Sequence, residues 1–265
     1  MTGSTGSARL DLSPRSAAAP LPRMVVAHAG LELRMMLRNG EQLLLTVVIP
    51  LGVLLALSLT SFVRLGVADT TAARATEVLP GVLTLAVLST AFTGLAIQTG
   101  FERRYGVLKR LGATPLSRGA LLLGKALAVA AVEAAQCLVL GGVALALGWT
   151  PVDSAWWAVG LLLVLGTVAF ASLGLLMAGV LRAEATLAAA NLVYLVLLFA
   201  GGIVVPLDRM PDAATRWLEL LPSAALSSGL AQAFDAGDLS VRAAATLAVW
   251  ALAAGGLTAR TFRWQ

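Results

Sequence analysis

Long apolar runs separated by short polar stretches dominate the pattern of hydrophobic and polar positions in this chain. Each run is near or above the roughly 20 residues that a helix needs to cross about 30 Å of hydrocarbon. Backbone groups in lipid must be satisfied within the membrane-spanning structure, and the alternation typical of barrel strands is absent, so the runs predict helices. The pattern predicts an all-α polytopic membrane protein with six transmembrane helices: Leu43–Val63, Val78–Gly100, Leu116–Leu147, Ala155–Leu181, Ala185–Pro206 and Ala243–Ala259.

Composition points to the same class. Of the 265 residues 58% are hydrophobic and 12% are charged, whereas soluble domains carry about 25% charged residues. The single cysteine, Cys137, cannot form an intramolecular disulfide or a cysteine metal cluster. The single histidine, His28, is expected at the membrane interface, on the opposite side from the hydroxyls of Ser227 and Ser228, which excludes a serine protease. We therefore expect neither catalytic residues nor a metal site.

The distribution of lysine and arginine predicts the orientation. Six spans place both termini on one side, and the 19 basic residues then divide fourteen to five in favour of that side. Basic residues collect on the cytoplasmic side of membranes, so both termini are predicted to be cytoplasmic in a bacterial cell membrane. The net charge of +5 follows from this asymmetry, and no pattern of interleaved basic and aromatic residues suggests a nucleic-acid partner.

The segment before the first span is polar and then amphipathic. Residues 1–22 are small, polar and basic, which predicts a disordered cytoplasmic tail. Residues 23–42 carry apolar positions at helical spacing with charged residues between them, which predicts an amphipathic helix in the cytoplasmic interface. A simple extension of the first span is the alternative, but Asn39-Gly40 is a helix breaker. Residues 43–260 would form the six-span domain and 261–265 a cytoplasmic C-terminus.

Glycine and proline interrupt the chain after the fifth span. Irregular backbone at membrane depth is tolerated only where protein or a water-filled cavity covers it. We therefore predict short, re-entrant helices near the outer boundary, between the fifth and sixth spans. The residues that mark this segment are Gly201, Gly202, Pro206, Pro211 and Pro222.

A basic stretch, FERRYGVLKRLGATPLSR, lies between the second and third spans. Tyr105, Leu108 and Leu111 are spaced as an amphipathic stripe flanked by basic residues, and Gly112 would end a short helix. Such a helix could bind anionic headgroups or dock in a groove on a cytoplasmic partner. The alternative is a solvated turn along the membrane.

The sequence from Gly119 to Ala126 resembles a phosphate-binding loop but fails as one. The motif G-x-x-x-x-G-K-[ST] needs a hydroxyl for magnesium at its last position, where this chain has Ala126. The intervening residues are also strongly apolar. Gly124 is therefore expected to allow close helix packing, and Lys125 to extend toward the cytoplasmic headgroups.

Several polar residues lie inside the predicted spans. Glu133 is an intramembrane carboxylate, which could carry a proton, bind a cationic substrate, or form a buried hydrogen bond with Gln136 or a neighbouring helix. Other polar positions share helix faces and either line a substrate path or join helices. These path candidates are Thr90, Thr93, Asn191 and Tyr194, together with Glu133.

Two motifs resemble type-2 ABC transporter permeases. The stretch ERRYGVLKRLGATP followed by Gly124-Lys125 is similar to that family's loop between the second and third spans. The matching positions are Glu102, Gly106, Leu108, Leu111, Thr114, Pro115, Gly124 and Lys125. The sequence GGIVVP, with Met210-Pro211 and Leu221-Pro222, resembles its outer re-entrant segment. The resemblance covers residues 24–260, with a departure at Arg104, where many members have an acidic residue.

The resemblance implies a permease subunit of a bacterial exporter for drugs, antibiotics or lipid-like molecules. It implies a separate ATPase subunit in two copies, which would hold ATP and magnesium, and a second permease subunit, the same or similar, in contact with membrane lipids. It also implies that the basic loop is a coupling helix contacting the ATPase. The residues assigned to coupling are Glu102, Arg103, Arg104, Tyr105, Gly106, Leu108, Lys109, Arg110 and Leu111.

Two other functions stay open at this point. A secondary transporter could use Glu133 as a proton carrier, although this class commonly has internal repeats and no convincing repeat is visible. A non-transporting membrane scaffold or immunity protein would need neither a polar interior nor an ATPase.

Overall fold

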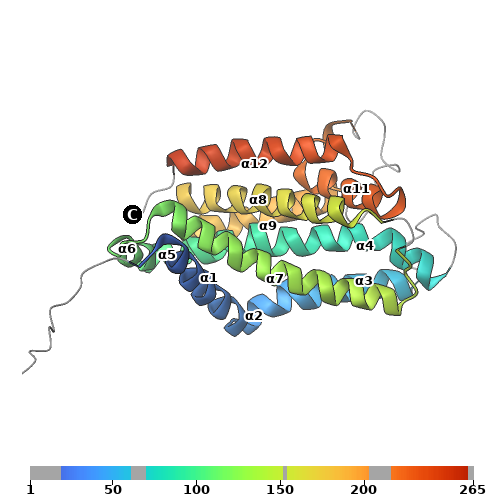
Figure 1. The fold of residues 1–265 in the computed structure, drawn as a ribbon, viewed down its shortest axis with the longest axis horizontal. Coiled ribbons are helices and arrows are strands. Elements are labelled where there is room, and N and C mark those ends of the chain that lie inside the picture. The colour runs from blue at the N-terminus through green and yellow to red at the C-terminus, as the bar shows by residue number, and fades with distance from the viewer. Residues whose placement is uncertain (1–18, 61–69, 152–153, 203–215, 262–265) are drawn as a thin grey trace, which may run out of the picture.

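The chain folds as a bundle of helices (Figure 1), seen in a computed structural model that describes residues 19–60, 70–151, 154–202 and 216–261. All regular secondary structure in these ranges is helical. In chain order the helices are α1 (Leu21–Arg38), α2 (Gly40–Leu43), the π-helix η1 (Leu44–Val48), α3 (Ile49–Leu59), α4 (Thr71–Val87), the π-helix η2 (Leu88–Gly94), α5 (Leu95–Arg104), α6 (Val107–Gly112), α7 (Arg118–Ala146), α8 (Trp156–Val180), α9 (Ala183–Ala200), α11 (Pro222–Asp235) and α12 (Val241–Thr261).

Five of the described helices are long and apolar enough to cross a membrane, which confirms a multi-pass helical membrane protein. They cover Thr71–Arg104, Gly119–Ala146, Trp156–Val180, Ala183–Ala200 and Val241–Thr261. The first predicted span corresponds to a shorter apolar helix, Thr46–Leu59, and its residues 61–63 lie outside the described residues. The exact count of six spans therefore stays a prediction.

The second span is the central helix of the bundle. It runs without a break through α4, η2 and α5, and 89% of its most apolar window is buried inside the protein. It begins seven residues before the predicted Val78, because the hydroxyl of Thr70 accepts a hydrogen bond from the Ala73 amide at 3.2 Å and caps the helix. Small side chains let neighbouring helices come close to it. A Cβ added at Gly174 of α8 would lie only 2.7 Å from the carbonyl oxygen of Phe92.

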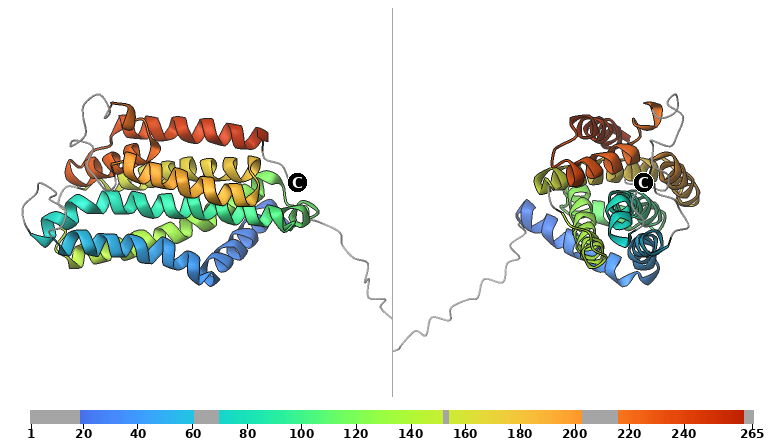
Figure 2. Two further views of the ribbon diagram at one scale, coloured as in Figure 1. Left: turned by 180° about the vertical axis from the view of Figure 1, so that it is seen from behind. Right: turned by 90° about the vertical axis from the view of Figure 1, so that its right-hand side faces the viewer.

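The bundle has two ends, which are named here after the helices that mark them. The α6 end holds α6, the last turn of α5, the first turn of α7 and the last turns of α8 and α12 (Figure 1). The α11 end holds α11 and the junction between α7 and α8. Helices α8 and α12 lie side by side along the bundle (Figures 1 and 2).

Helix α1 lies across the side of the bundle and packs against α7. It ends at Asn39, whose backbone is extended, so the break predicted at Asn39-Gly40 is present. The face turned toward α7 contains Val25 and Met36, as expected for an amphipathic helix, but also the buried polar residues His28 and Glu32. The helix thus brings charged groups into the protein and does not only present an apolar face to lipid.

The segment between the fifth and sixth spans is described in part. Helix α9 ends at Ala200, and Gly202 adopts a positive φ of 71° in the turn that follows. Pro206 and Pro211 lie outside the described residues. Pro222 starts α11, a 14-residue helix that packs against α4, α8 and α12. Whether α11 is re-entrant in a membrane stays a prediction.

Candidate functional site

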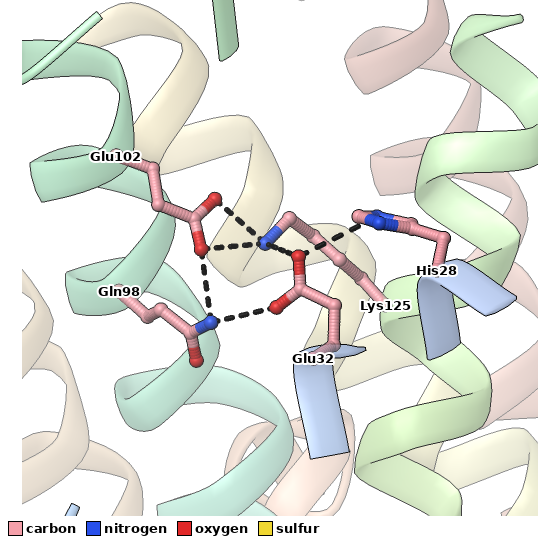
Figure 3. A network of polar contacts seen from close by, with 5 residues as sticks. All are labelled: His28, Glu32, Gln98, Glu102 and Lys125. Carbon is pink, nitrogen blue, oxygen red and sulfur yellow. Dashed lines mark hydrogen bonds and ion pairs between the residues drawn. The ribbon is translucent and has the colours of Figure 1, made fainter. Parts of the chain in front are cut away.

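A buried cluster of polar residues joins three helices near the α6 end (Figure 3). Lys125 of α7 lies at its centre, with Nζ 2.8 Å from Oε1 of Glu32 on α1 and 2.7 Å from Oε2 of Glu102 on α5. The amide of Gln98 donates hydrogen bonds to both carboxylates, at 2.7 Å to Glu32 and 2.9 Å to Glu102. His28, one turn before Glu32, completes the set with Nε2 3.4 Å from Glu32 Oε1. We call these five residues the charge cluster.

The position of Lys125 corrects the sequence prediction. Lys125 does not extend to the headgroups, because its side chain is fully buried between the two carboxylates. The prediction for Gly124 is confirmed: a Cβ there would lie 2.5 Å from Cδ2 of His28 and 3.4 Å from the Ala29 nitrogen. Residues 119–125 form a regular part of α7 rather than a loop. The near match to a phosphate-binding loop is therefore a helix–helix contact.

The charge cluster carries a formal negative charge. Glu32 and Glu102 contribute two negative charges and Lys125 one positive charge. Burial lowers the pKa of His28 below its ordinary value of 6.5; the carboxylates of Glu32 and Glu102 act in the opposite direction and Lys125 in the same direction. The lowered pKa favours the neutral imidazole at neutral pH, and the formal charge of the cluster is then minus one. His28 is buried against α7 rather than exposed at an interface.

The start of the basic loop is anchored on α8 and α9. The guanidinium of Arg103 donates hydrogen bonds to the carbonyls of Ala178, Gly179 and Leu181 at 2.9, 2.6 and 2.9 Å. These carbonyls end α8 and would otherwise lack partners. Arg104 forms an ion pair with Glu184 in the first turn of α9. The loop is thus attached to the junction of two spans.

Helix α6 matches the short helix predicted in this loop. Gly106 precedes it with a positive φ of 69°, a conformation that favours glycine. Leu108 is fully buried and Leu111 is partly buried, which attaches α6 to the bundle. Tyr105 is 67% exposed, and Lys109 and Arg110 also face outward.

Seven of the nine residues assigned to coupling fall into two groups, while Gly106 forms the turn before α6 and Leu111 is partly buried against the core. Glu102, Arg103 and Leu108 hold the loop from inside the protein, through the charge cluster, the α8 carbonyls and the core. Arg104, Tyr105, Lys109 and Arg110 form an exposed surface that we call the α6 surface. The first group is buried or partly buried, and the second is exposed.

A groove of about 670 Å³ opens between α1, the two π-helices, α5 and α9. Three of the five path candidates, Thr93, Asn191 and Tyr194, line it. Apolar and aromatic side chains form most of the remaining wall, including Met35, Ile49, Ile97, Phe101 and Leu187. Glu102 of the charge cluster also lines the groove. A cavity of this size suits a drug-sized molecule.

Thr90 and Glu133 do not line the groove and have structural partners instead. The amide of Gln136 on α7 donates to the hydroxyl of Thr90 at 3.0 Å and to the carbonyl of Thr46 at 2.5 Å. It thereby ties η2 to η1 beneath the groove. Glu133 accepts a hydrogen bond from the hydroxyl of Thr167 on α8. A neighbouring helix, rather than Gln136, thus provides the described partner of Glu133.

Sequence reasoning missed Glu32, Gln98 and Gln136 as site residues. For Glu32 a signal exists: His28 and Glu32 are one turn apart and in register with Val25 and Met36, which places two polar residues on the packed face of α1. No local signal pairs Glu32 with Lys125, which lies 93 positions further along the chain.

The membrane spans define the chain as a multi-pass helical membrane protein with a groove large enough for a small molecule. The model of the ABC-2 type transporter family matches residues 28–234. This range is most of the chain and includes the charge cluster, the groove and α6, so the chain belongs to the ABC-2 type transporter family. A search of curated proteins finds no match.

Proposed function

We propose that this chain is the permease subunit of a bacterial ATP-driven exporter of drugs, antibiotics or lipid-like molecules. A separate ATPase subunit, in two copies, would bind ATP and magnesium, and a second permease subunit, the same or similar, would complete the membrane part. The α6 end would then face the cytoplasm, with both chain termini on that side. Family membership supports the permease role.

The observation that carries the proposal is the α6 surface. It combines three exposed cations, Arg104, Lys109 and Arg110, with the exposed ring of Tyr105, on α6 and the end of α5 at one end of the bundle. Aromatic and arginine side chains are the residue types most often dominant in protein interfaces. An ATPase docked here would contact a rigid element rather than a free loop.

The internal contacts of the loop provide a route for movement. The charge cluster ties the last turn of α5 to α1 and α7, while Arg103 ties the same turn to the end of α8. A displacement of α6 would therefore act on four helices at once. The groove lies beside these contacts, since Glu102 belongs both to its wall and to the charge cluster. ATP-driven motion of α6 would thus change the groove directly.

Substrate is proposed to enter the groove, whose wall is mostly apolar by area and where Thr93, Asn191 and Tyr194 are among the polar side chains that would offer hydrogen bonds. Mostly apolar pockets with a few placed polar groups are typical of small-molecule sites. This composition favours a small amphipathic substrate over a large polar one.

Affinity purification of the full chain from its own membranes tests the proposal. We expect an ABC ATPase subunit to co-purify in equal amount and its ATP hydrolysis to depend on the permease. Recovery of the chain without any ATPase, together with transport driven by a proton gradient through the chain alone, would support the secondary-transporter alternative instead.

A further inference from the structure

We propose that the groove selects amphipathic organic cations, and that Glu102 is the residue that determines this specificity. The inference rests on the proposed function, because it names the substrate class of the same groove. It concerns small molecules that join a protonated amine or comparable cation to an apolar body.

The first support is the charge of the groove wall. Among the described residues that line it, Glu102 is the only charged one. The remaining wall is apolar, aromatic, or neutral and polar, with no lining lysine or arginine in the described part of the chain. The Glu102 side chain is 11% exposed, so a cation in the groove would lie beside this largely buried carboxylate, with no positive side chain on that wall. An anion would be repelled by Glu102 and would find no positive side chain on the described wall.

The second support is the balance of the charge cluster. The positive charge of Lys125 is divided between two carboxylates, because its ammonium also lies 2.8 Å from Glu32. Glu102 is therefore not fully neutralised by Lys125. Two carboxylates therefore compete for one buried cation, and the formal excess is one negative charge. Buried charge of this kind is costly unless it is compensated. A bound ligand cation beside Glu102 would supply the missing positive charge.

The third support is the aromatic wall next to Glu102. Phe101 and Tyr105 lie on either side of it in sequence, line the groove, and stack on each other with ring centroids 6.1 Å apart. Aromatic faces attract organic cations. Arg104 already lies over the Tyr105 ring at 5.9 Å, but its guanidinium is held by Glu184 outside the groove lining. The face of Phe101 is thus the stronger candidate for ligand contact.

A phospholipid headgroup fits this site less well than a small cation. An ethanolamine or choline headgroup carries a phosphate next to its ammonium, which would bring a negative charge close to Glu102. The groove volume of about 670 Å³ also suits a drug-sized molecule rather than a two-chain lipid. We therefore commit to a small amphipathic cation as the occupant.

Three probes with one apolar body test the inference: a dansyl-alkylamine, its N-acetylated neutral form and a dansyl-alkylcarboxylate. Each is titrated by fluorescence into nanodiscs of phosphatidylcholine that hold the full-length wild-type chain, with empty discs as the blank. We expect the cation to bind about tenfold more tightly than the neutral probe, and the anion to bind most weakly. Equal affinity for the cation and the neutral probe would overturn the inference.

Two variants that each remove one negative charge show which carboxylate produces the preference for the cationic probe. Glu102→Gln leaves Lys125 in a balanced pair with Glu32, so folding is expected to survive, and the preference for the cation should fall to about threefold or less. Glu32→Gln removes the same charge from a residue that does not line the groove, and should keep most of the preference. An unchanged preference in Glu102→Gln, or an equal loss in both variants, would contradict the assignment.

A third variant keeps the test decisive if Glu102→Gln does not fold. Asn191→Trp places a large side chain in the groove and should weaken the cation and the neutral probe alike. Unchanged binding of both would show that the probes bind elsewhere. The assay contains no ATPase and no nucleotide, so loss of selectivity is distinct from failure of ATPase co-purification, which tests the exporter proposal.

Discussion

The ammonium of Lys125 on α7 lies 2.7 Å from a carboxylate oxygen of Glu102 on α5, with the lysine side chain fully buried. Glu102 begins the loop that carries the α6 surface, and Lys125 lies in a predicted membrane span. This pair therefore joins the loop to the membrane bundle. A matching contact from Lys125 to Glu32 brings α1 into the same connection.

Removal of the Lys125 ammonium should unfold or loosen this region. In Lys125→Met, Glu32 and Glu102 would face each other without a cation, and loss of one partner from a buried ionic pair costs about 3–5 kcal/mol. We expect a corresponding decrease in the free energy of unfolding, measured in mixed detergent micelles. Lys109→Met, at an exposed lysine of α6, is the control and should change stability little. Equal stability of the two variants would show that the cluster contributes no net stabilisation.

A methyl group at Gly124 should push α1 away from α7. The added Cβ of Gly124→Ala would lie 2.5 Å from the His28 ring, so either the ring or the helix must move. Overpacking of this kind costs about 1–3 kcal/mol. The matched control is Gly142→Ala on the same helix, where an added Cβ meets nothing within 4 Å. Thermal melting of both variants in detergent should separate them; a similar melting temperature would argue against close α1–α7 packing.

Stability should depend on pH through His28. Burial lowers the pKa of the folded-state imidazole below 6.5, so between 6.5 and that lower value the unfolded chain binds a proton that the folded chain does not. The free energy of unfolding should therefore decrease as the pH falls below 6.5 and be unaffected by His28 above it. His28→Gln should reduce this slope, while the titration of other groups persists. An identical slope in the wild type and the variant would place the pH dependence elsewhere.

Glu133 separates the exporter from the proton-coupled alternative. It lies away from the groove and accepts a hydrogen bond from Thr167, a contact that the amide of Glu133→Gln can preserve. We expect this variant to retain most ATP-dependent transport in proteoliposomes when its expression is normal. Loss of transport with normal folding would restore a charge-based role for this carboxylate.

The hydrophobic pattern was sufficient to predict the helical membrane class and the approximate positions of the long spans. Their interiors were predictable because only long apolar helices satisfy the backbone in lipid. The start of the second span was not, since residues 71–77 continue the helix from its cap at Thr70 although they carry Arg74 and Glu77 and only Ala75 among them is buried. A hydropathy criterion assigns such residues to a loop.

The charge cluster could not be predicted from sequence patterns. Lys125 lies close to the end of a predicted span, where an isolated lysine extends to the headgroups. Its true environment depends on α1 crossing α7 at Gly124, which brings Glu32 to the lysine from 93 positions away. The short helix of the basic loop was predictable from the spacing of Leu108 and Leu111. The division of its residues into internal anchors and an exposed surface required the three-dimensional structure.

The most direct test of the proposed function is charge reversal on the α6 surface. Lys109→Glu with Arg110→Glu changes two exposed residues without touching Glu102, Arg103 or Leu108, so the bundle should fold normally. Arg260→Glu, also exposed at the α6 end but on α12, is the control. Transport and permease-stimulated ATP hydrolysis are then measured together in proteoliposomes with the co-purified ATPase.

We expect the double reversal to reduce both transport and ATP hydrolysis by about tenfold or more, because like charges brought together at an interface weaken binding strongly. Arg260→Glu should leave both activities near the wild-type level. Full transport and full stimulation of ATP hydrolysis in a folded Lys109→Glu, Arg110→Glu variant would contradict the assignment of α6 as the coupling helix.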